Sequence, residues 1–172
     1  MATDEDLIAA VAAGDDEALA ALYRRYERPL HAFLVRYTGG RDVDDLVQES
    51  WLRIVRAADR FDPARRFSTW LFQIAVNLCR DWHRSPPPEP HDPDTLAGDG
   101  APDAIAPRDA AIDAHRLLAA LPEGQRAAVL LRYYHDLPED EVAAILDVPR
   151  GTVKSRLHTA MTTLKFLAGK DA

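Results

Sequence analysis

The chain has 172 residues, of which 47% are hydrophobic, and its formal net charge is −7 at neutral pH. This length can bury one moderate core or two small ones, and the excess of acid argues against a protein that coats nucleic acids or membranes non-specifically. A single cysteine, Cys79, excludes an internal disulfide framework, and no basic leader or long apolar run occurs, so we expect a cytoplasmic protein without signal peptide or membrane insertion.

The first part of the chain is predicted to be helical throughout, because Ala, Leu, Arg, Glu and Asp dominate it without sustained alternation of apolar and polar residues. Thr3 is placed to cap a first helix. Asp15 or Asp16 begins a long second helix, in which Pro29 predicts a kink or a new start. The Gly-Gly pair after it ends this helix, and residues 42–58, DVDDLVQESWLRIVRAA, form the third.

The third helix carries acids in its first turn, as the helix dipole favours. Its candidate exposed face combines acids and an amide with one leucine: Asp44, Asp45, Gln48, Glu49 and Leu52. Such a face is either a solvated surface or a docking surface for a basic partner, where charge complementarity raises the association rate and fixes orientation.

A loop, DRFDPARRFS, separates the third helix from a fourth, predicted over about residues 69–84. One face of this helix is apolar, and another carries amide and guanidinium donors suited to phosphates and exposed base edges. The loop mixes aromatic rings with arginines, as a pocket for a flipped, single-stranded base requires, although each ring can equally belong to the core. The candidates are Phe61, Arg65, Arg66, Phe67, Trp70, Gln73, Asn77, Arg80 and Arg84.

The composition changes between residues 85 and 109, which hold seven of the twelve prolines and six acids but one arginine. Proline removes backbone donors, and too few apolar residues remain there to build a core. Residues 85–110 are therefore predicted to be a flexible, extended acidic linker between two small helical domains.

After the linker, three helices are expected over about residues 111–120, 122–134 and 138–146, and a further helix begins near Pro149. The last two have the spacing of a helix-turn-helix, with Asp147 in the tight turn. Apolar residues recur every three or four positions along the last helix and are expected to face the core.

The outward side of this last helix is basic. Residues 148–170 contain five Lys or Arg and no acid, opposite in sign to the whole chain. In a helix-turn-helix, the first turns of the second helix enter the major groove and its flanks hold phosphates. The candidates for these contacts are Arg150, Gly151, Thr152, Lys154, Ser155, Arg156 and His158. The alternative is a basic face that is merely solvated.

Several of these segments together resemble the extracytoplasmic-function (ECF) group of bacterial RNA polymerase sigma factors, in the sigma-70 family. LPEDEVAAILDVPRGTVKSRLHTAMTTL resembles the part that reads the promoter −35 element, and GTVKSRLH is its most specific piece. DVDDLVQESWLRIVRA resembles the segment that docks on the clamp helices of the polymerase large subunit, and RFDPARRFSTWLFQIAVNLCRDWHR resembles the segments that melt and read the −10 element. The motifs follow the family's order.

The resemblance implies an all-α protein with two small helical domains. Residues 1–84 would bind core RNA polymerase and the −10 element, residues 85–110 would be the linker, and residues 111–172 would read the −35 element. The acidic face of the third helix would dock on the clamp helices, and the other two candidate sets would contact promoter DNA. An anti-sigma factor is implied as a further partner, and the protein would join the nucleoid when bound to polymerase.

No nucleophile–base motif, phosphate-binding loop or suggestive carboxylate pair occurs, so an enzyme is not expected, nor is a cofactor. Cys79 and His83 stand at i and i+4 but have no third ligand nearby, so no metal site is predicted.

The chain also departs from the family pattern. Threonines and one methionine stand at 159 and 161–163, where these sigma factors commonly carry arginines and acids. Fewer cations mean fewer phosphate contacts, which predicts weak −35 binding without polymerase. Two other classes remain open on the residues alone: a conventional helix-turn-helix regulator with an N-terminal dimerisation or sensing module, and a helical adaptor that binds only proteins.

Overall fold

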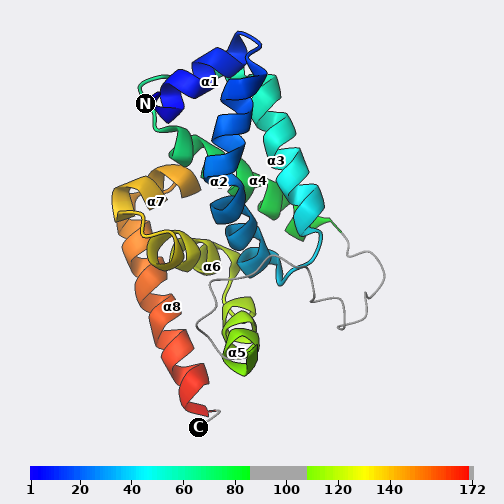
Figure 1. Cartoon of the computed structure of the whole chain (residues 1–172). Coiled ribbons are helices and arrows are strands. Elements are labelled where there is room, and N and C mark those ends of the chain that lie inside the picture. Colours follow the sequence, from blue (N-terminus) through cyan, green and yellow to red (C-terminus); the bar gives the residue numbers. More distant parts are fainter. Residues whose placement is uncertain (86–107, 171–172) are drawn as a thin grey trace.

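The computed structural model describes residues 1–85 and 108–170, with the side chains of 108–112 and 170 left aside. Within these ranges the chain is helical and has no strand (Figure 1). It forms an N-terminal and a C-terminal helical domain, so the expected all-α architecture is confirmed. Most of the predicted linker, residues 86–107, lies outside the described residues. The helices in chain order are α1 (Asp4–Ala12), α2 (Asp16–Thr38), α3 (Val43–Ala57), α4 (Phe67–Arg84), α5 (Arg108–Ala119), α6 (Glu123–Val129), α7 (Glu139–Leu146) and α8 (Arg150–Lys170).

The two N-terminal helices begin at side-chain caps that the sequence indicates. The Thr3 hydroxyl accepts a hydrogen bond from the Asp6 backbone N–H at 3.1 Å, and the Asp6 carboxylate accepts one from the Thr3 N–H at 3.0 Å, which completes a capping box before α1. Asp15 caps α2 by accepting hydrogen bonds from the backbone N–H groups of the second and third residues after it.

α2 does not start anew at its proline, one of the two outcomes expected there. The helix runs from Asp16 to Thr38 with Pro29 inside it and ends at Gly39, whose φ of 72° lies in the left-handed region that glycine adopts without strain. Tertiary packing explains why the helix continues. Leu30 and Phe33, just after the proline, are fully buried, and their burial offsets the single backbone hydrogen bond that proline removes.

α4 begins two residues earlier than expected, and α1 provides its cap. Arg66 precedes the helix and makes no side-chain cap. Instead, the Phe67 backbone N–H donates to the Glu5 carboxylate at 2.9 Å. The first helix therefore satisfies one of the unpaired donors at the start of the fourth. The loop between α3 and α4 starts with a 3-10 turn, Ala58–Arg60.

The C-terminal domain contains the expected helix-turn-helix. α6 continues into a π-helical segment, Leu130–Tyr134, and α7 and α8 follow. Asp147 makes the turn between α7 and α8 with a φ of 54°, a conformation that Asp tolerates better than most residues. The buried apolar residues of this domain are Leu118, Leu121, Ala127, Ala128, Val129, Leu130, Leu131, Val142, Ile145, Leu146, Val153, Leu157 and Ala160.

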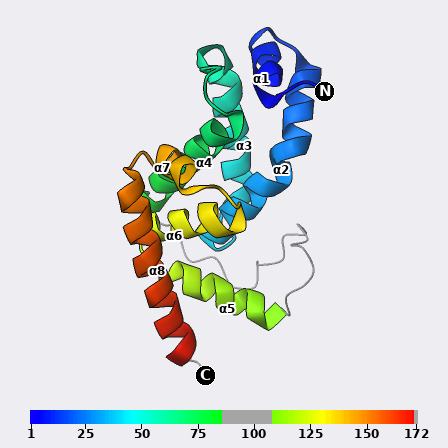
Figure 2. The ribbon, with the colours of Figure 1, turned by 90° about the vertical axis from the view of Figure 1, so that its left-hand side faces the viewer.

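The two domains dock against each other, although the composition of the chain indicates separate modules. α6 and α7 lie beside α2 and α4 (Figures 1 and 2). The His135 ring, just after the π-helical segment, packs against two rings of the N-terminal domain, with centroids 5.8 Å from Phe33 and 4.8 Å from Phe72. Aromatic packing of this kind contributes beyond the area it buries.

Arg126 of α6 also bridges the domains. Its side chain is 8% exposed, and its guanidinium donates four hydrogen bonds to backbone carbonyls. One acceptor is Tyr37 of α2, at 2.9 Å; the others, at the end of α5 and just after it, belong to Leu118, Ala119 and Leu121. These four hydrogen bonds make burial of the charge tolerable.

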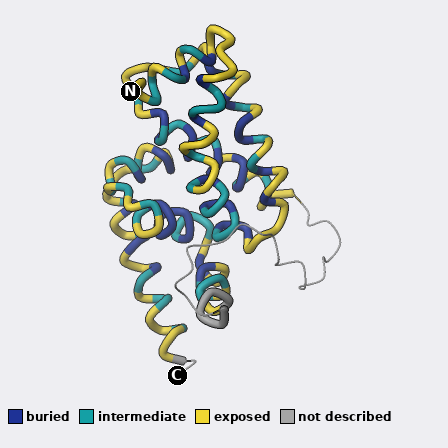
Figure 3. The backbone as a smooth tube through the Cα atoms, viewed as in Figure 1, coloured by how far each residue is buried: buried dark blue, intermediate teal, exposed yellow. Residues whose placement is uncertain are grey.

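The far half of α8 extends beyond this packed region. From residue 161 to 169 its positions are exposed or half-buried, and in Figure 3 this end of the helix is mostly yellow and teal, whereas buried positions gather where helices face each other. The N-terminal half of α8 therefore anchors the helix.

Candidate nucleic-acid and protein interfaces

The polar face of α3 lies at the surface. Burial of Val43, Leu46, Ser50, Trp51 and Ile54 fixes the rotation of the helix, because these positions recur at helical spacing. The predicted residues Asp44, Asp45, Gln48 and Leu52 are consequently exposed, and Glu49 is half-buried. Glu49 accepts a hydrogen bond from Arg53, one turn later, at 3.0 Å, so its carboxylate is partly neutralised within the helix.

Exposed apolar side chains continue this face, and sequence reasoning missed them. Val55 is 44% exposed and Tyr23 of α2 is 39% exposed, beside Leu52 at 40%. The Tyr23 ring lies 5.2 Å from that of Trp51. The spacing of Leu52 and Val55, three residues apart, was the available signal. The face thus combines acids with an apolar edge, as a protein-binding surface does.

The loop before α4 is organised by its aromatic rings, and this corrects one candidate. Phe67 is 0% exposed, with its ring 5.2 Å from Tyr26 and 6.2 Å from Trp70. Phe61 and Trp70 are half-buried, with centroids 5.2 Å apart. Phe67 is therefore a core residue in this structure and has no face free for a base. Phe61 and Trp70 keep partial exposure.

The polar candidates of the loop and α4 share one side of the domain, and most are already paired. The Arg65 guanidinium donates to Gln73 at 2.9 Å, and that of Arg84 donates to Asp81 at 3.2 Å. Asn77 is exposed. These pairs hold the side chains in position, but they are exposed or half-buried, so each contributes little to stability.

Two arginines of this set reach across to the C-terminal domain. Arg66 pairs with Glu141 of α7 at 2.8 Å, and Arg80 pairs with Glu123 of α6 at 3.2 Å. Glu123 also accepts a hydrogen bond from the Tyr37 hydroxyl at 2.7 Å. In the docked arrangement, a carboxylate thus engages one nitrogen of each guanidinium, Nη1 of Arg66 and Nε of Arg80.

The outward side of the helix-turn-helix matches the prediction at most positions. Arg150, Gly151, Lys154, Ser155 and His158 are exposed, because burial of Val153, Leu157 and Ala160 turns the opposite side of α8 inward. Thr152 is half-buried. The Arg150 guanidinium pairs with Glu139 of α7 at 3.3 Å, which fixes it beside the start of the helix.

Arg156 departs from the prediction that it faces outward. Its guanidinium packs over α6, where a Cβ placed on Gly124 would lie 3.0 Å from the Arg156 Cζ atom. One of its terminal nitrogens, Nη1, is buried without a hydrogen-bond partner among the described residues. Arg156 therefore joins α8 to α6 in this structure and does not face outward as Lys154 does. Arg156 lies on the flank of α8, next to the buried apolar stripe. This position in the sequence was the available signal that its side chain packs inward.

Cys79 and His83 differ in environment. Cys79 is fully buried in α4, and burial, with the charge of Glu123 as a smaller cause, raises the pKa of its thiol to about 12. His83 is exposed. Among the residues described, no group of three His, Cys, Asp or Glu side chains converges.

No helix in the described ranges is both long and apolar enough to cross a membrane.

Two family models match this chain: sigma-70 region 2 over residues 22–86 and sigma-70 region 4 over residues 112–164. The ECF RNA polymerase sigma-E factor of Salmonella typhimurium (strain LT2) is 35% identical, in an alignment that covers 92% of this chain and 90% of that protein. The ECF sigma-E factor of Haemophilus influenzae is 31% identical, with 92% and 91% covered.

Solved structures share the fold. CnrH, in complex with the cytosolic domain of CnrY, gives a TM-score of 0.75 at 28% identity and covers 98% of this chain and 99% of its own. The sigma factor RpoE of Bartonella quintana, in complex with the anti-sigma factor NepR, gives 0.69 at 23% identity and covers 89% and 98%. Regions 2 and 4 in this order define a sigma-70-type transcription initiation factor. Within that class, the chain belongs to the ECF RNA polymerase sigma factors.

Proposed function

We propose that this protein binds core RNA polymerase and directs it to promoters by recognising −10 and −35 elements. The observation that carries the proposal is the presence of both sigma-70 regions in one chain that aligns with ECF sigma-E factors over 92% of its length. The conventional regulator is disfavoured, because it would not need region 2. The helical adaptor is disfavoured by the exposed cations at the start of α8.

The roles divide between three surfaces. The exposed face of α3, with Asp44, Asp45, Gln48 and Leu52, is proposed to dock on the clamp helices. The exposed amide and guanidinium groups of the loop and α4 are proposed to hold the melted −10 strand, since amide and guanidinium donors suit phosphates and base edges. Arg150 and Lys154, at the start of α8, are proposed to read the −35 duplex from the major groove.

The chemistry of transcription stays with the polymerase, and this chain acts by binding alone. We propose that it works in the bacterial cytoplasm, at the nucleoid when it is part of the holoenzyme. An anti-sigma factor is proposed as a further partner. The similar protein CnrH is bound to the cytosolic domain of CnrY, which supports a protein partner for this chain.

Run-off transcription with purified core polymerase tests the function. The full chain is added to core enzyme on a library of promoter fragments, and transcripts are expected only when both are present. Asp45→Lys reverses a charge on the docking face, and we expect it to weaken association with core enzyme by about ten-fold because complementary charges orient the encounter. Its helical content, measured by circular dichroism, should not change.

Glu27→Lys is the matched control for this variant. Glu27 is an exposed residue of α2, so the same change in net charge is made away from the docking face. A chain that binds duplex DNA as a dimer and gives no transcript with core polymerase would overturn the proposal in favour of a conventional regulator. Equal core binding by both variants would overturn the assignment of the α3 face.

A further inference from the structure

α4 begins without a cap of its own. Arg66, the residue before it, provides no side-chain cap, and the first turn of the helix, residues 67–70, contains no acid. A helix that starts in this way leaves backbone N–H groups without partners. The shortage matters most at Phe67, because this residue is fully buried and an unpaired N–H group that is shielded from water is costly.

Glu5 of α1 supplies the missing acceptor. Its Oε1 atom accepts a hydrogen bond from the Phe67 backbone N–H at 2.9 Å. The C=O of the same peptide unit, which belongs to Arg66, accepts a hydrogen bond from the Trp70 N–H at 3.2 Å. Both polar groups of the peptide between Arg66 and Phe67 are therefore engaged, one within α4 and the other by a residue 62 positions away in the sequence.

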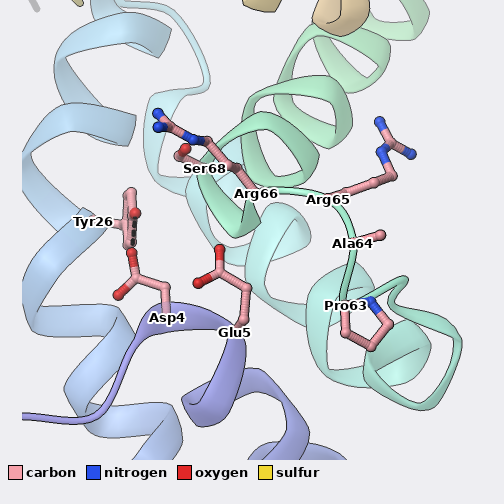
Figure 4. Close-up of a pocket in the computed structure, with 8 residues that line it drawn as sticks. All are labelled: Asp4, Glu5, Tyr26, Pro63, Ala64, Arg65, Arg66 and Ser68. Carbon is pink, nitrogen blue, oxygen red and sulfur yellow. Dashed lines mark hydrogen bonds between the residues drawn. The ribbon is translucent and has the colours of Figure 1, made fainter.

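α1 is itself fixed to the rest of the N-terminal domain. Asp4 accepts hydrogen bonds from the Arg25 guanidinium and the Tyr26 hydroxyl of α2, and Ile8 is fully buried. Glu5 is half-buried, and Figure 4 shows its side chain pointing from α1 toward the loop, in the wall of a pocket of about 580 Å³. The contacts of α1 with α2 and the core, rather than the loop, thus set the position of Glu5.

The backbone of the loop before α4 is held at its two ends. At the beginning, Asp62 closes a turn, because its carboxylate accepts a hydrogen bond from the Ala64 N–H at 2.9 Å and its C=O accepts one from the Arg65 N–H at 3.0 Å. At the other end, the chain is held by burial of Phe67 and by the hydrogen bond to Glu5. The two adjacent arginines of the loop lie just before this second end, so the direction in which their side chains leave the backbone depends on it.

We propose that Glu5 is a positioning residue for promoter opening, which fixes the backbone at the start of α4 and so holds the loop ready for melted −10 DNA. This inference rests on the proposed function, in which the loop and α4 hold the melted strand. A loop that is already ordered loses less conformational freedom when it meets the strand. The sigma-70 region 2 model begins at residue 22, so this role falls to a helix outside the matched residues.

The proposal predicts an effect on one step of initiation. The loop meets bases only after the strands separate, whereas the cations of α8 are proposed to bind duplex DNA before that. Glu5 should therefore accelerate strand opening and leave the initial binding of the duplex unchanged.

The test uses holoenzyme made from the full chain and core polymerase on one preferred promoter. Strand opening is followed by stopped-flow fluorescence of 2-aminopurine placed in the −10 segment, and the observed rate is measured over a range of holoenzyme concentrations. The plateau of this rate reports strand opening. The concentration that gives half of the plateau reports initial binding, so the two steps are measured separately.

Two substitutions separate the length of the Glu5 side chain from its charge. Glu5→Asp keeps the charge but is one methylene shorter, so its carboxylate falls short of the Phe67 N–H, and the plateau rate should fall about five-fold, the effect of one hydrogen bond of average strength. Glu5→Gln loses the charge but keeps an oxygen acceptor of the same reach, and its plateau should stay within about two-fold of the wild type. The half-plateau concentration should change in neither variant. Glu27→Asp, at an exposed position of α2, is the control and should keep both wild-type values.

The outcomes separate this inference from the proposed function. An unchanged plateau in Glu5→Asp would overturn it, and so would a plateau in Glu5→Gln as low as that of Glu5→Asp. A higher half-plateau concentration in Glu5→Asp would overturn it as well, because the hydrogen bond would then support folding or binding rather than opening. Failure of the proposed function would appear separately, as wild-type holoenzyme that opens no promoter.

Discussion

The buried side chain of Arg126 connects three segments of this fold. Its four hydrogen bonds go to backbone carbonyls of α2, of α5 and of the junction after α5. Sequence patterning places this arginine on a helix but not inside the protein, because charged residues are buried only where partners are available. Those partners are backbone carbonyls near the ends of α2 and α5 and at Leu121, and a pattern of side chains does not reveal them.

We expect Arg126→Met to lower the free energy of unfolding by about 2–4 kcal/mol, because buried carbonyls lose their donors while the apolar volume is largely kept. Urea denaturation followed by circular dichroism measures the change. Arg84→Met is the control, since that side chain is 75% exposed, and it should shift stability by no more than about 0.5 kcal/mol. Similar losses in both variants would contradict the role of the buried guanidinium.

His135 makes the packing between the domains sensitive to pH. Burial, with the nearby charge of Arg36 as a smaller cause, lowers the pKa of His135 to about 4. An unfolded histidine has a pKa of about 6.5, so between these values the unfolded chain binds more protons than the folded one. The stability that the neutral ring confers is fully present above pH ~6.5 and is lost as the pH falls toward about 4.

His135→Phe should remove this contribution while keeping a ring against Phe33 and Phe72. Its free energy of unfolding should therefore fall less steeply than that of the wild type between pH 7 and pH 5, when both are measured in urea. His83→Gln, at an exposed position, should keep the wild-type slope. If the free energy of unfolding fell equally steeply with pH in the wild type and in His135→Phe, the His135 ring would not be held neutral in the folded protein.

At the scale of elements, local signals explain most of the fold. Caps at Thr3 and Asp15, glycines after α2 and the apolar stripe of α8 each place a helix end or face. Of the kink or new start expected at Pro29, the new start does not occur, because burial of the following residues keeps the helix continuous. At the start of α4, a carboxylate from α1 replaces a local cap. Both differences arise from contacts distant in sequence, which local propensity does not contain.

The two faces of α8 should respond differently to substitution. Lys154 is exposed at the start of the helix, whereas Arg156 packs over Gly124. Lys154→Ala should weaken binding to a preferred −35 sequence by about 1–3 kcal/mol and relax the preference at one base pair. Arg156→Ala should lower thermal stability and leave the −35 preference unchanged. Transcription from a library of −35 sequences measures the preference, and loss of preference in Arg156→Ala would place that side chain at the DNA.

At the scale of the whole molecule, the docking of the domains is the feature that the sequence does not predict. Composition identifies two helical units and a Pro-rich stretch between them, and this suggests independent modules. The contacts that join the units are specific pairs such as Arg66 with Glu141 and Arg80 with Glu123. In the sequence, each member of these pairs is indistinguishable from an ordinary surface charge, because its partner lies on the other domain.

The double variant Glu123→Gln and Glu141→Gln should favour separated domains, because it removes both charges that hold these arginines. We expect a larger radius of gyration in small-angle X-ray scattering at low salt, and a smaller further increase on raising the salt than in the wild type, since salt screens the same charges. Each pair is partly exposed, so its contribution is at most about 1 kcal/mol. Glu17→Gln with Glu27→Gln is the control at exposed positions of α2. Identical salt dependence in both double variants would show that the ion pairs do not hold the domains together.

The burial of Cys79 has a consequence for signalling. Oxidants, nitrosating agents and electrophiles react with the thiolate form of an accessible cysteine. The only cysteine of this chain is enclosed in the core, with a pKa raised to about 12, so at neutral pH almost none of it is thiolate. Peroxide or disulfide stress therefore meets no reactive thiol in the folded protein.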